Sequence, residues 1–326
     1  NYYEGISGDF QEKDRHLSSR WSSDLTFRHD HGTHRSLAGF AFNYDHIDST
    51  AVGNRQRQAF GLYLQDLWDL NDTLLFHSGL RWDRVGQYQA LSPRLGLTWF
   101  LGDHFNLGLN YGTAFRVPTM NDLYSRWVEE NPELKPEKGD KWELTGHWKD
   151  AQRSFTVNLF RTQLREGIVW LDPEGDWIYK PENIEQIKTA GFNLIATYDW
   201  GPVETSLGYT FVDQRGWDSL RNSYTRDLNF FGQHRLHLKG QADLGKFNIN
   251  AGCQVVGARR DERFRYGKVP GRMPDYLLLS AGIRYQLSTN YVLSLDVENL
   301  TDTKYQIQEG YPMPGRNFKL TLNGRF

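Results

Sequence analysis

The sequence has little of what stabilises most small secreted or metal-binding domains. A single cysteine, Cys253, stands among 326 residues, which excludes a disulfide framework and a cysteine-based zinc site. No run approaches the ~18–20 apolar residues that a membrane-spanning helix needs. Neither sign of charge dominates, since 38 Lys and Arg stand against 40 Asp and Glu. The net charge of −2 therefore provides no general nucleic-acid footprint, and no nucleic-acid partner is expected.

Aromatic residues are abundant in a chain that is otherwise poor in apolar residues. Phe, Trp and Tyr make up 14% of the sequence and there are 31 glycines, whereas hydrophobic residues reach only 38%. Disordered chains are poor in aromatics, so this composition excludes disorder. A chain that is polar overall but rich in aromatics and glycine has the balance expected of a barrel with lipid outside and water inside.

Apolar and polar residues alternate with a period of two along most of the chain. Between positions 104 and 112, Phe105, Leu107, Leu109 and Tyr111 occupy one face, and asparagines and glycines occupy the other. Alternation of this kind predicts β-strands with two unlike faces, and most segments are near the ~9–11 residues with which a tilted strand crosses a bilayer. Fifteen strands are predicted, near 21–29, 35–44, 58–68, 73–84, 91–100, 104–113, 140–149, 152–163, 187–199, 203–212, 233–242, 246–256, 276–286, 291–299 and 316–326.

The connections between these strands are expected to alternate in length. Short turns near 69–72 and 243–245, for example, each follow a strand that begins after a longer connection. A closed membrane barrel with short periplasmic turns and long extracellular loops has this rhythm. The longer loops are expected at 45–57, 85–90, 114–139, 164–186, 213–232, 257–275 and 300–315.

Aromatic and charged side chains fit the same architecture. Trp68, Trp99, Trp148 and Tyr285 each lie on an apolar face just before a short turn, as expected for an aromatic girdle at one membrane interface. The polar faces carry many arginines, lysines and carboxylates, whose unpaired burial in a dry core would cost several kcal/mol each. The sequence therefore predicts an all-β fold, a transmembrane antiparallel β-barrel of the cell outer membrane.

Several motifs along this pattern resemble those of TonB-dependent outer-membrane receptors. The resemblance runs in the family's order from about residue 57 to the end, and residues 1–56 fit a generic barrel. The motifs are Ser-Pro-Arg-Leu-Gly-Leu at 92–97, Tyr-Gly-Thr-Ala-Phe-Arg-Val-Pro-Thr at 111–119, Asn-Pro-Glu-Leu-Lys-Pro-Glu at 131–137, Trp-Glu-Leu at 142–144, Asn-Leu-Thr-Asp at 299–302, Gly-Tyr-Pro-Met-Pro-Gly-Arg at 310–316 and the terminal Phe326.

The resemblance carries expectations about architecture and function. Such receptors have a 22-stranded barrel with a plugged lumen, so residues 1–326 are interpreted as the C-terminal part of that barrel, one domain without the N-terminal plug. The family implies uptake of a scarce nutrient, expected to be a ferric siderophore, with energy from the TonB–ExbB–ExbD complex. Cobalamin is the alternative ligand, and a passive porin-like channel is the alternative function. An enzyme is not expected, because the sequence offers no convincing carboxylate–His or Ser–His set.

Ligand contacts are expected in the longer loops, where arginines and aromatics are mixed. That mixture suits an anionic, partly aromatic ligand through charge-assisted hydrogen bonds and cation–π contacts. The same arginines could instead bind lipopolysaccharide phosphate, and Arg116 could instead pair with a lumenal carboxylate. The candidate substrate-binding residues are Arg116, Tyr124, Trp127, Trp170, Trp177, Trp217, Arg259, Arg260, Arg263 and Tyr266.

No cofactor and no metal site is expected. Haem receptors of the resembled family carry a ligating histidine between the two central motifs. None of the ten histidines of this chain lies in that stretch, residues 119–130. Haem is therefore not expected as the ligand.

Overall fold

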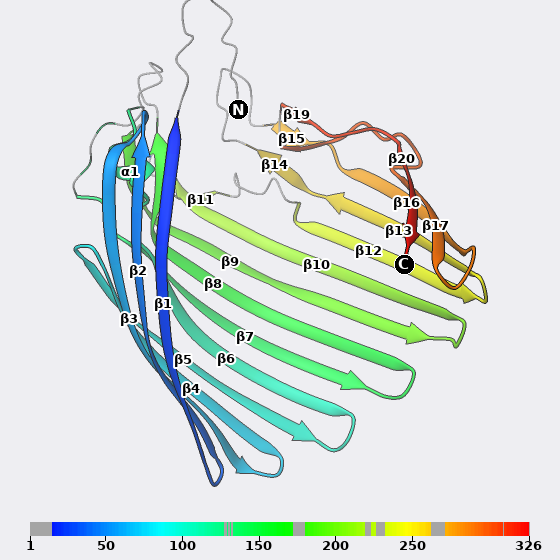
Figure 1. Cartoon of the computed structure of the whole chain (residues 1–326), viewed down its shortest axis with the longest axis horizontal. Coiled ribbons are helices and arrows are strands. Elements are labelled where there is room, and N and C mark those ends of the chain that lie inside the picture. Colours follow the sequence, from blue (N-terminus) through cyan, green and yellow to red (C-terminus); the bar gives the residue numbers. More distant parts are fainter. Residues whose placement is uncertain are drawn as a thin grey trace, which may run out of the picture. The chain divides into compact units, whose positions relative to one another are not determined.

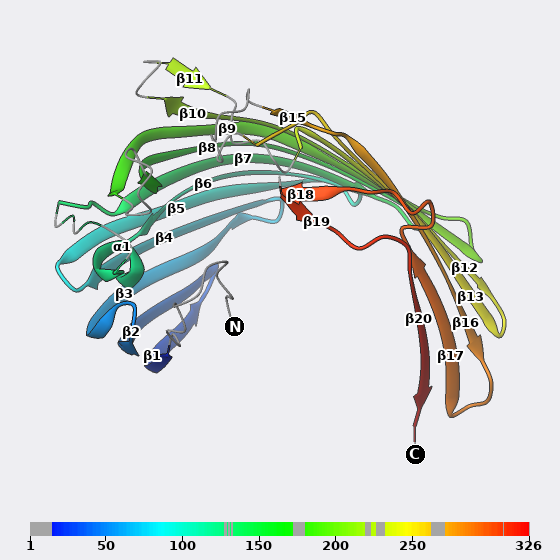
Figure 2. The ribbon, with the colours of Figure 1, turned by 90° about the horizontal axis from the view of Figure 1, so that it is seen from above.

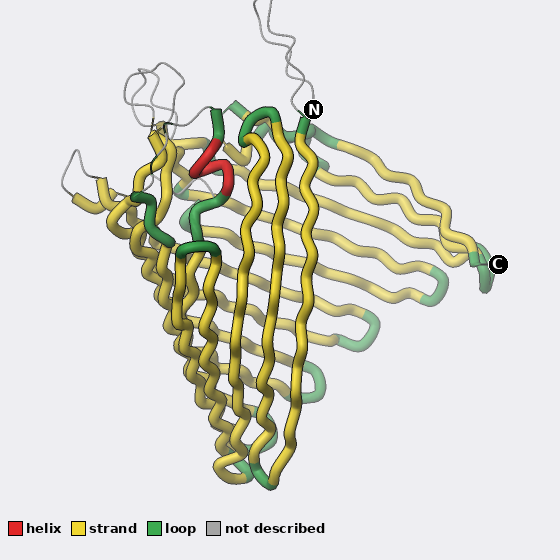
Figure 3. The backbone as a smooth tube through the Cα atoms, turned by 60° about the vertical axis from the view of Figure 1, so that its left-hand side comes forward, coloured by secondary structure: helices red, strands yellow, loops and turns green. Residues whose placement is uncertain are grey.

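The computed structural model of the chain consists almost entirely of β-strands (Figure 1). It describes residues 15–126, 129, 131, 133–171, 180–218, 223–225, 232–261, 271–308 and 310–325. These residues include one short helix, α1 (Met120–Tyr124), drawn in red beside strand ends in Figure 3. Within the described ranges, no helix is long and apolar enough to cross a membrane.

Fifteen strands follow one another in a sheet whose order is the order of the chain, so each strand is hydrogen-bonded to the next (Figure 1). A sixteenth, the short β11 (Ser223–Thr225), pairs with β10. The fifteen are β1 (His16–His31), β2 (His34–Ser49), β3 (Gly53–Asn71), β4 (Leu74–Val85), β5 (Tyr88–Leu101), β6 (Phe105–Arg116), β7 (Glu137–Lys149), β8 (Arg153–Leu171), β9 (Lys180–Asp199), β10 (Val203–Asp218), β12 (His234–Leu244), β13 (Phe247–Gly257), β16 (Tyr276–Gln286), β17 (Tyr291–Glu298) and β20 (Asn317–Gly324).

Two short hairpins lie outside this sheet, in the connections that precede β16 and β20. β14 (Arg259–Asp261) pairs with β15 (Gly271–Met273), and β18 (Gln306–Gln308) pairs with β19 (Tyr311–Pro312). The chain divides into two compact units. Unit 1 comprises residues 1–97, 111–140 and 163–186, and unit 2 comprises 98–110, 141–162 and 187–326.

In unit 1, strands β1 to β4 have one apolar face and one polar face. Leu62 is exposed on the apolar face, and its neighbour Tyr63 points to the other side, because successive side chains of a strand alternate. On the polar face the Tyr63 hydroxyl donates to Asp24 Oδ1 at 3.0 Å, and Arg81 binds Asp83 with an Nη2–Oδ1 distance of 2.7 Å. The polar face is therefore held by a hydroxyl contact between β3 and β1 and by an ion pair within β4.

Two glycines allow long polar side chains to lie flat on that face. A Cβ atom on Gly39 would overlap the ring of Tyr63, and one on Gly61 would overlap the guanidinium of Arg81. Glycine in a strand marks such a close approach. A cavity of about 630 Å³ lies beside these residues, and its polar lining comes from side chains that include Asp24, Tyr63, Arg81, Asp83, Arg94 and Thr113.

The fifteen strands expected from alternation all form, but several extend further than the pattern indicated. β2 and β3 leave only residues 50–52 between them, and β4 and β5 leave only 86–87. The prediction of long connections at 45–57 and 85–90 is therefore wrong. Beyond the apolar band both faces of a strand are polar, so alternation ends while the backbone ladder continues. The Ser49 hydroxyl accepts from the N–H of Val52, and Gly53 has a φ of 78°, which together close the β2–β3 turn.

In unit 2, β12, β13, β16, β17 and β20 are successive neighbours (Figure 2). The motif at 299–302 builds the connection before β20. Asn299 is 5% exposed, and its side chain donates to Thr303 O and accepts from Thr303 N, both at 2.9 Å. Asp302 Oδ1 accepts from Arg316 N at 2.8 Å. The motif at 299–302 thus forms a turn that is closed by the side chains of Asn299 and Asp302.

Candidate functional site

Segment 117–136 connects β6 to β7 in unit 1 and contains α1. Thr119 is the N-cap of the helix. Its hydroxyl accepts from Asp122 N at 3.1 Å, and Asp122 Oδ2 accepts from Thr119 N at 2.7 Å. This reciprocal arrangement is a capping box, which satisfies two helix-end donors at once. It fixes the direction in which the chain leaves β6.

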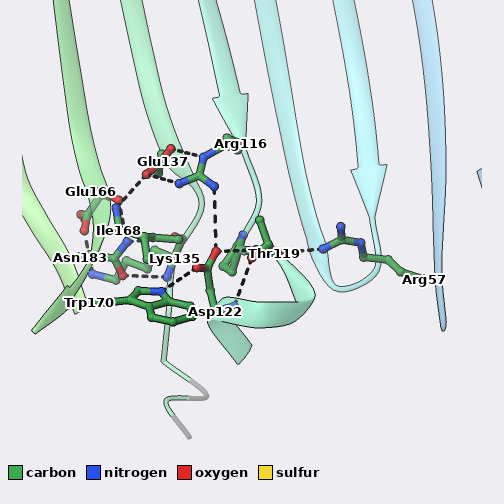
Figure 4. A network of polar contacts seen from close by, with 11 residues as sticks. Arg57, Arg116, Thr119, Asp122, Lys135, Glu137, Glu166, Ile168, Trp170 and Asn183 are labelled. Atoms are coloured by element: carbon green, nitrogen blue, oxygen red, sulfur yellow. Dashed lines mark hydrogen bonds and ion pairs between the residues drawn. The ribbon is translucent and has the colours of Figure 1, made fainter. Parts of the chain in front are cut away.

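Arg116, the last residue of β6, binds Glu137, the first residue of β7 (Figure 4). Its Nε donates to Oε2 at 2.5 Å and its Nη2 donates to Oε1 at 2.6 Å, a bidentate geometry. Glu137 is 8% exposed, and its Oε1 also accepts from Ile168 N at 2.8 Å. Arg116 therefore joins the two ends of the connection. It pairs with a carboxylate, which was the alternative to ligand contact that the sequence left open.

Asp122 connects α1 to Arg116 and to Trp170 of β8 (Figure 4). It is 8% exposed, its Oδ1 accepts from Trp170 Nε1 at 2.9 Å, and Arg116 Nη1 lies 3.9 Å from its Oδ2. The structure thus brings together two residues that the sequence nominated separately. Both carboxylates of this network have protein donors, so the arrangement is an anchor rather than an acid–base pair.

The connection is also fastened to β3 and to the β2–β3 turn. Arg57 Nη1 donates to Pro118 O at 2.8 Å, as Figure 4 shows, and Arg126 N donates to Ala51 O at 2.8 Å. The guanidinium of Arg55 lies 4.3 Å from the centroid of the Tyr124 ring, within cation–π range. Tyr124, a predicted ligand contact, is 38% exposed and is held by this stacking.

The other side of the connection is fastened to β8 and β9. Asn131 Nδ2 donates to Pro181 O at 2.9 Å. Asn183 Oδ1 accepts from Lys135 N at 2.9 Å, and its Nδ2 donates to Lys135 O at 3.0 Å and to Glu166 O at 2.6 Å (Figure 4). We call the described residues between 116 and 137 the anchored segment, because side chains of β3, β8 and β9 bind them.

Unit 2 contains a second network, centred on Arg259 of β14. This residue is 2% exposed. Its Nη2 donates to Gln306 O and Ile307 O, each at 2.6 Å, and its Nη1 donates to Pro274 O at 3.1 Å. Its guanidinium also lies 4.9 Å from the Tyr276 ring centroid. Arg259 therefore binds the β18 strand to its own hairpin, and such burial does not support direct ligand contact.

The remaining candidates lie on strands or outside the described residues. Trp217 lies on β10, where its backbone pairs with that of Tyr224 in β11. Arg260 is exposed on β14, opposite Arg272 of β15. Four candidates lie outside the described residues: Trp127, Trp177, Arg263 and Tyr266.

Sequence reasoning did not name the partners that give these networks their form. Asp122 could have been found from its spacing, because Thr-x-x-Asp before a helix is the pattern of a capping box. Glu137 and Asn183 lie 21 and 67 residues beyond Arg116, and no local pattern connects them. In the part of the chain that the structure describes, no three His, Cys, Asp or Glu side chains are grouped so that they could hold a metal ion.

Comparison with known proteins agrees with the strand order and the motifs. The family model described as TonB dependent receptor-like, beta-barrel matches residues 1–300. The chain is 24% identical over 305 residues to the vitamin B12 transporter BtuB of Photobacterium profundum, covering 89% of this chain and 45% of that protein. It is 28% identical over 243 residues to BtuB of Vibrio vulnificus, covering 70% and 37%.

Its fold is similar to that of the siderophore receptor PirA from Acinetobacter baumannii, with a TM-score of 0.81 at 16% identity, over 96% of this chain and 55% of that one. The chain spans less than half the length of the curated relatives it matches. Because the family model covers 300 of the 326 residues, the chain belongs to the TonB-dependent receptors, as part of their outer-membrane β-barrel.

Proposed function

We propose that this chain is the membrane wall of a transporter that carries a large, scarce nutrient across the outer membrane, with energy from the TonB–ExbB–ExbD complex. The observation that carries the proposal is the family match over residues 1–300. The anchored segment adds support, because the central motifs at 111–119 and 131–137 supply the residues that hold it. Neither network supplies an acid–base pair, so the proposal is for a transporter and not for an enzyme.

Cobalamin is the first ligand to test, because the two relatives described above are named vitamin B12 transporters. A ferric siderophore is the second, and was the first expectation from the mixture of arginines and aromatics. Its support is reduced by two features: Arg116 binds Glu137, and Arg259 is buried against backbone carbonyls. Arg260, which is exposed, remains available for an anionic ligand or for lipopolysaccharide phosphate.

The test is uptake by cells in which the gene encoding this chain is deleted and then restored, with and without functional TonB. Radiolabelled cyanocobalamin and radiolabelled ferric siderophores of the catecholate class serve as the two probes. Restoration should increase uptake of one probe only when TonB is functional. Equal uptake without TonB would favour the passive channel, and no gene-dependent uptake of either probe would overturn the proposed ligands.

A further inference from the structure

The outer face of β1 to β4 in unit 1 has a layered order that the strand registers define. Leu25, Phe40, Leu62 and Trp82 are directly opposite one another on successive strands, and so are Phe27, Ala38, Leu64 and Leu80. We call these the apolar rows. Leu25, Phe27 and Leu64 are exposed by 72%, 68% and 58%, so this face presents hydrocarbon to its surroundings. In an outer-membrane barrel, the face that presents exposed leucines is the lipid face.

Two further rows follow toward the short turn at residues 32–33, and they differ in chemistry. The next row, the polar row, is formed by His29, Ser36, Asp66 and Ser78. The last, the ring row, is formed by His31, His34, Trp68 and Phe76. The usual interface places aromatic rings directly beside the hydrocarbon. Here a row with a carboxylate lies between the apolar rows and the rings.

Asp66 is the charged centre of the polar row. Its Oδ1 accepts from the Ser36 hydroxyl at 2.7 Å, and its Oδ2 lies 2.7 Å from His34 Nδ1. A carboxylate has about four acceptor positions, so these contacts leave capacity for further donors. The side chain of Asp66 is 26% exposed and that of His34 is 41% exposed. The carboxylate is thus oriented and still reachable from the lipid side.

Imidazole N–H groups border the same position. His29 occupies the polar row on β1, and its ring stacks on that of His31, with centroids 6.0 Å apart and an interplanar angle of 7°. His34 stacks on Trp68 at 5.0 Å. Neighbouring strands are ~4.8 Å apart, so about 10 Å separates the backbones that carry His29 and Asp66, and the two side chains can approach one headgroup from either side.

We propose that the polar row binds the headgroup of a phospholipid with a primary ammonium group, phosphatidylethanolamine, in the leaflet nearer the short turns. The ammonium group donates hydrogen bonds to Asp66, and an N–H of His29 donates to the phosphate. Charge complementarity supports this occupant, because a carboxylate on a lipid face attracts a cation and the imidazoles supply donors to an anion. A choline headgroup has no N–H to donate, and a glycerol headgroup has no cation.

The test uses the full-length receptor in nanodiscs that contain equal amounts of phosphatidylethanolamine and phosphatidylcholine. Lipids that stay bound after transfer to detergent are counted by native mass spectrometry. The unaltered protein should retain the ethanolamine lipid with a preference of about tenfold, which corresponds to one charge-assisted hydrogen bond. Asp66→Asn should reduce that preference to near one.

The matched control is Asp69→Asn. Asp69 lies three residues along the same strand on the opposite face, where Arg35 Nη2 binds its carboxylate at 2.9 Å. It should leave the lipid preference unchanged. His29→Ala should lower the total phospholipid retained without changing the ratio of the two lipids. Heat-modifiable mobility verifies that each variant is folded.

Three outcomes would overturn the proposal: no preference in the unaltered protein, an unchanged preference in Asp66→Asn, or equal losses in Asp66→Asn and Asp69→Asn. A further control replaces the ethanolamine lipid with a glycerol lipid that has the same acyl chains. If the protein then retains the glycerol lipid over the choline lipid as strongly as it retained the ethanolamine lipid, the acyl chains and not the polar row account for retention.

Discussion

The anchored segment of unit 1 and the Arg259 network of unit 2 use arginine in opposite ways. Arg116 is half-exposed and binds a carboxylate that is almost completely buried. Arg259 is itself buried, and three backbone carbonyls and a tyrosine ring surround its guanidinium. In the first network the guanidinium binds a carboxylate, whereas the contacts described for the second use the number and direction of the guanidinium's donors toward backbone carbonyls.

The difference predicts which property of arginine each site requires. At Arg116 the bidentate pairing and the positive charge both matter, because Glu137 and Asp122 are both poorly exposed. At Arg259 the planar arrangement of N–H donors matters most, since lysine cannot reach three carbonyls and stack on a ring in the same way. Five predictions follow, from the largest expected effect to the smallest: the first two test this comparison, and the other three test a helix cap, a backbone conformation and a turn in the same two units.

Replacing Arg259 with Met should lower the free energy of unfolding by about 3 kcal/mol, because several buried carbonyls lose their donors at once. Arg259→Lys should recover less than half of the loss. Unfolding in urea, followed by tryptophan fluorescence in lipid vesicles, measures both. The control is Arg260→Met on the same strand, which is exposed and should change the value by less than about 0.5 kcal/mol. Equal effects at the two positions would contradict the assignment.

Glu137→Gln should lower the free energy of unfolding by about 2 kcal/mol, less than the change at Arg259 because Arg116 is half-exposed and solvent screens part of the pairing. The amide cannot accept both donors of Arg116, and its NH₂ would face one of them. The same urea titration applies. Lys138→Gln, at the exposed adjacent position, is the control, and a loss there as large as at Glu137 would rule out a specific role for the ion pair.

Thr119→Ala should cost about 1 kcal/mol, since it removes the hydroxyl that caps α1. Thr119→Ser retains the hydroxyl and should be nearly neutral. Protease cleavage between 119 and 126 in the folded protein is the second measurement, and it should increase for Ala only. A serine variant as sensitive as the alanine variant would show that the methyl group, and not the cap, stabilises this region.

Ala258→Gly should stabilise the protein by about 0.5 kcal/mol. Ala258 has a φ of 54°, a conformation that costs an L-residue roughly 1–2 kcal/mol, and glycine offsets part of this gain through its greater freedom in the unfolded chain. Ala251→Gly, in the middle of β13, should instead destabilise. The comparison requires only the difference between two thermal midpoints, and a lower midpoint for the variant at 258 would contradict it.

The smallest effect concerns the β7–β8 turn. The Arg153 guanidinium and the N–H groups of residues 152 and 153 bind Asp150, and they lower its pKa from 3.8 to about 2. The stabilisation by this carboxylate is complete above pH 3.8 and is lost as the pH falls toward 2. The difference in thermal midpoint between wild type and Asp150→Asn should therefore be constant near neutral pH and shrink below about pH 4. A difference that stays constant down to the lowered pKa would contradict the prediction.

Most of the strand order could be predicted from the sequence because one face of each strand meets lipid. The alternation of Phe105, Leu107 and Leu109 with small polar residues reflects that environment in the local sequence. The strand ends show no such alternation. Around Asp45 and Arg57 both faces are polar, yet β2 and β3 continue their pairing there, so the connection expected at 45–57 is a three-residue turn.

The side-chain networks were predictable only in part, because they join residues far apart in the chain. The pairing of Arg116 with a carboxylate was a stated alternative, but nothing local identifies Glu137 as its partner. Arg259 stands in an arginine-rich stretch that suggests exposure, whereas its acceptors Gln306 and Ile307 are 47 and 48 residues away. Burial of this guanidinium depends on two loops meeting, which periodicity does not encode.

The anchored segment has a consequence for the order in which the chain assembles. The main strands pair with their neighbours in sequence, and short turns close quickly. The contact of Arg57 with Pro118 and that of Asn131 with Pro181 span 61 and 50 residues, so they require β3 and β9 to be in place already. Breaking these contacts should leave the rate of folding almost unchanged and accelerate unfolding. The anchored segment, which carries the family's central motifs, would then determine how long the folded sheet persists before it unfolds.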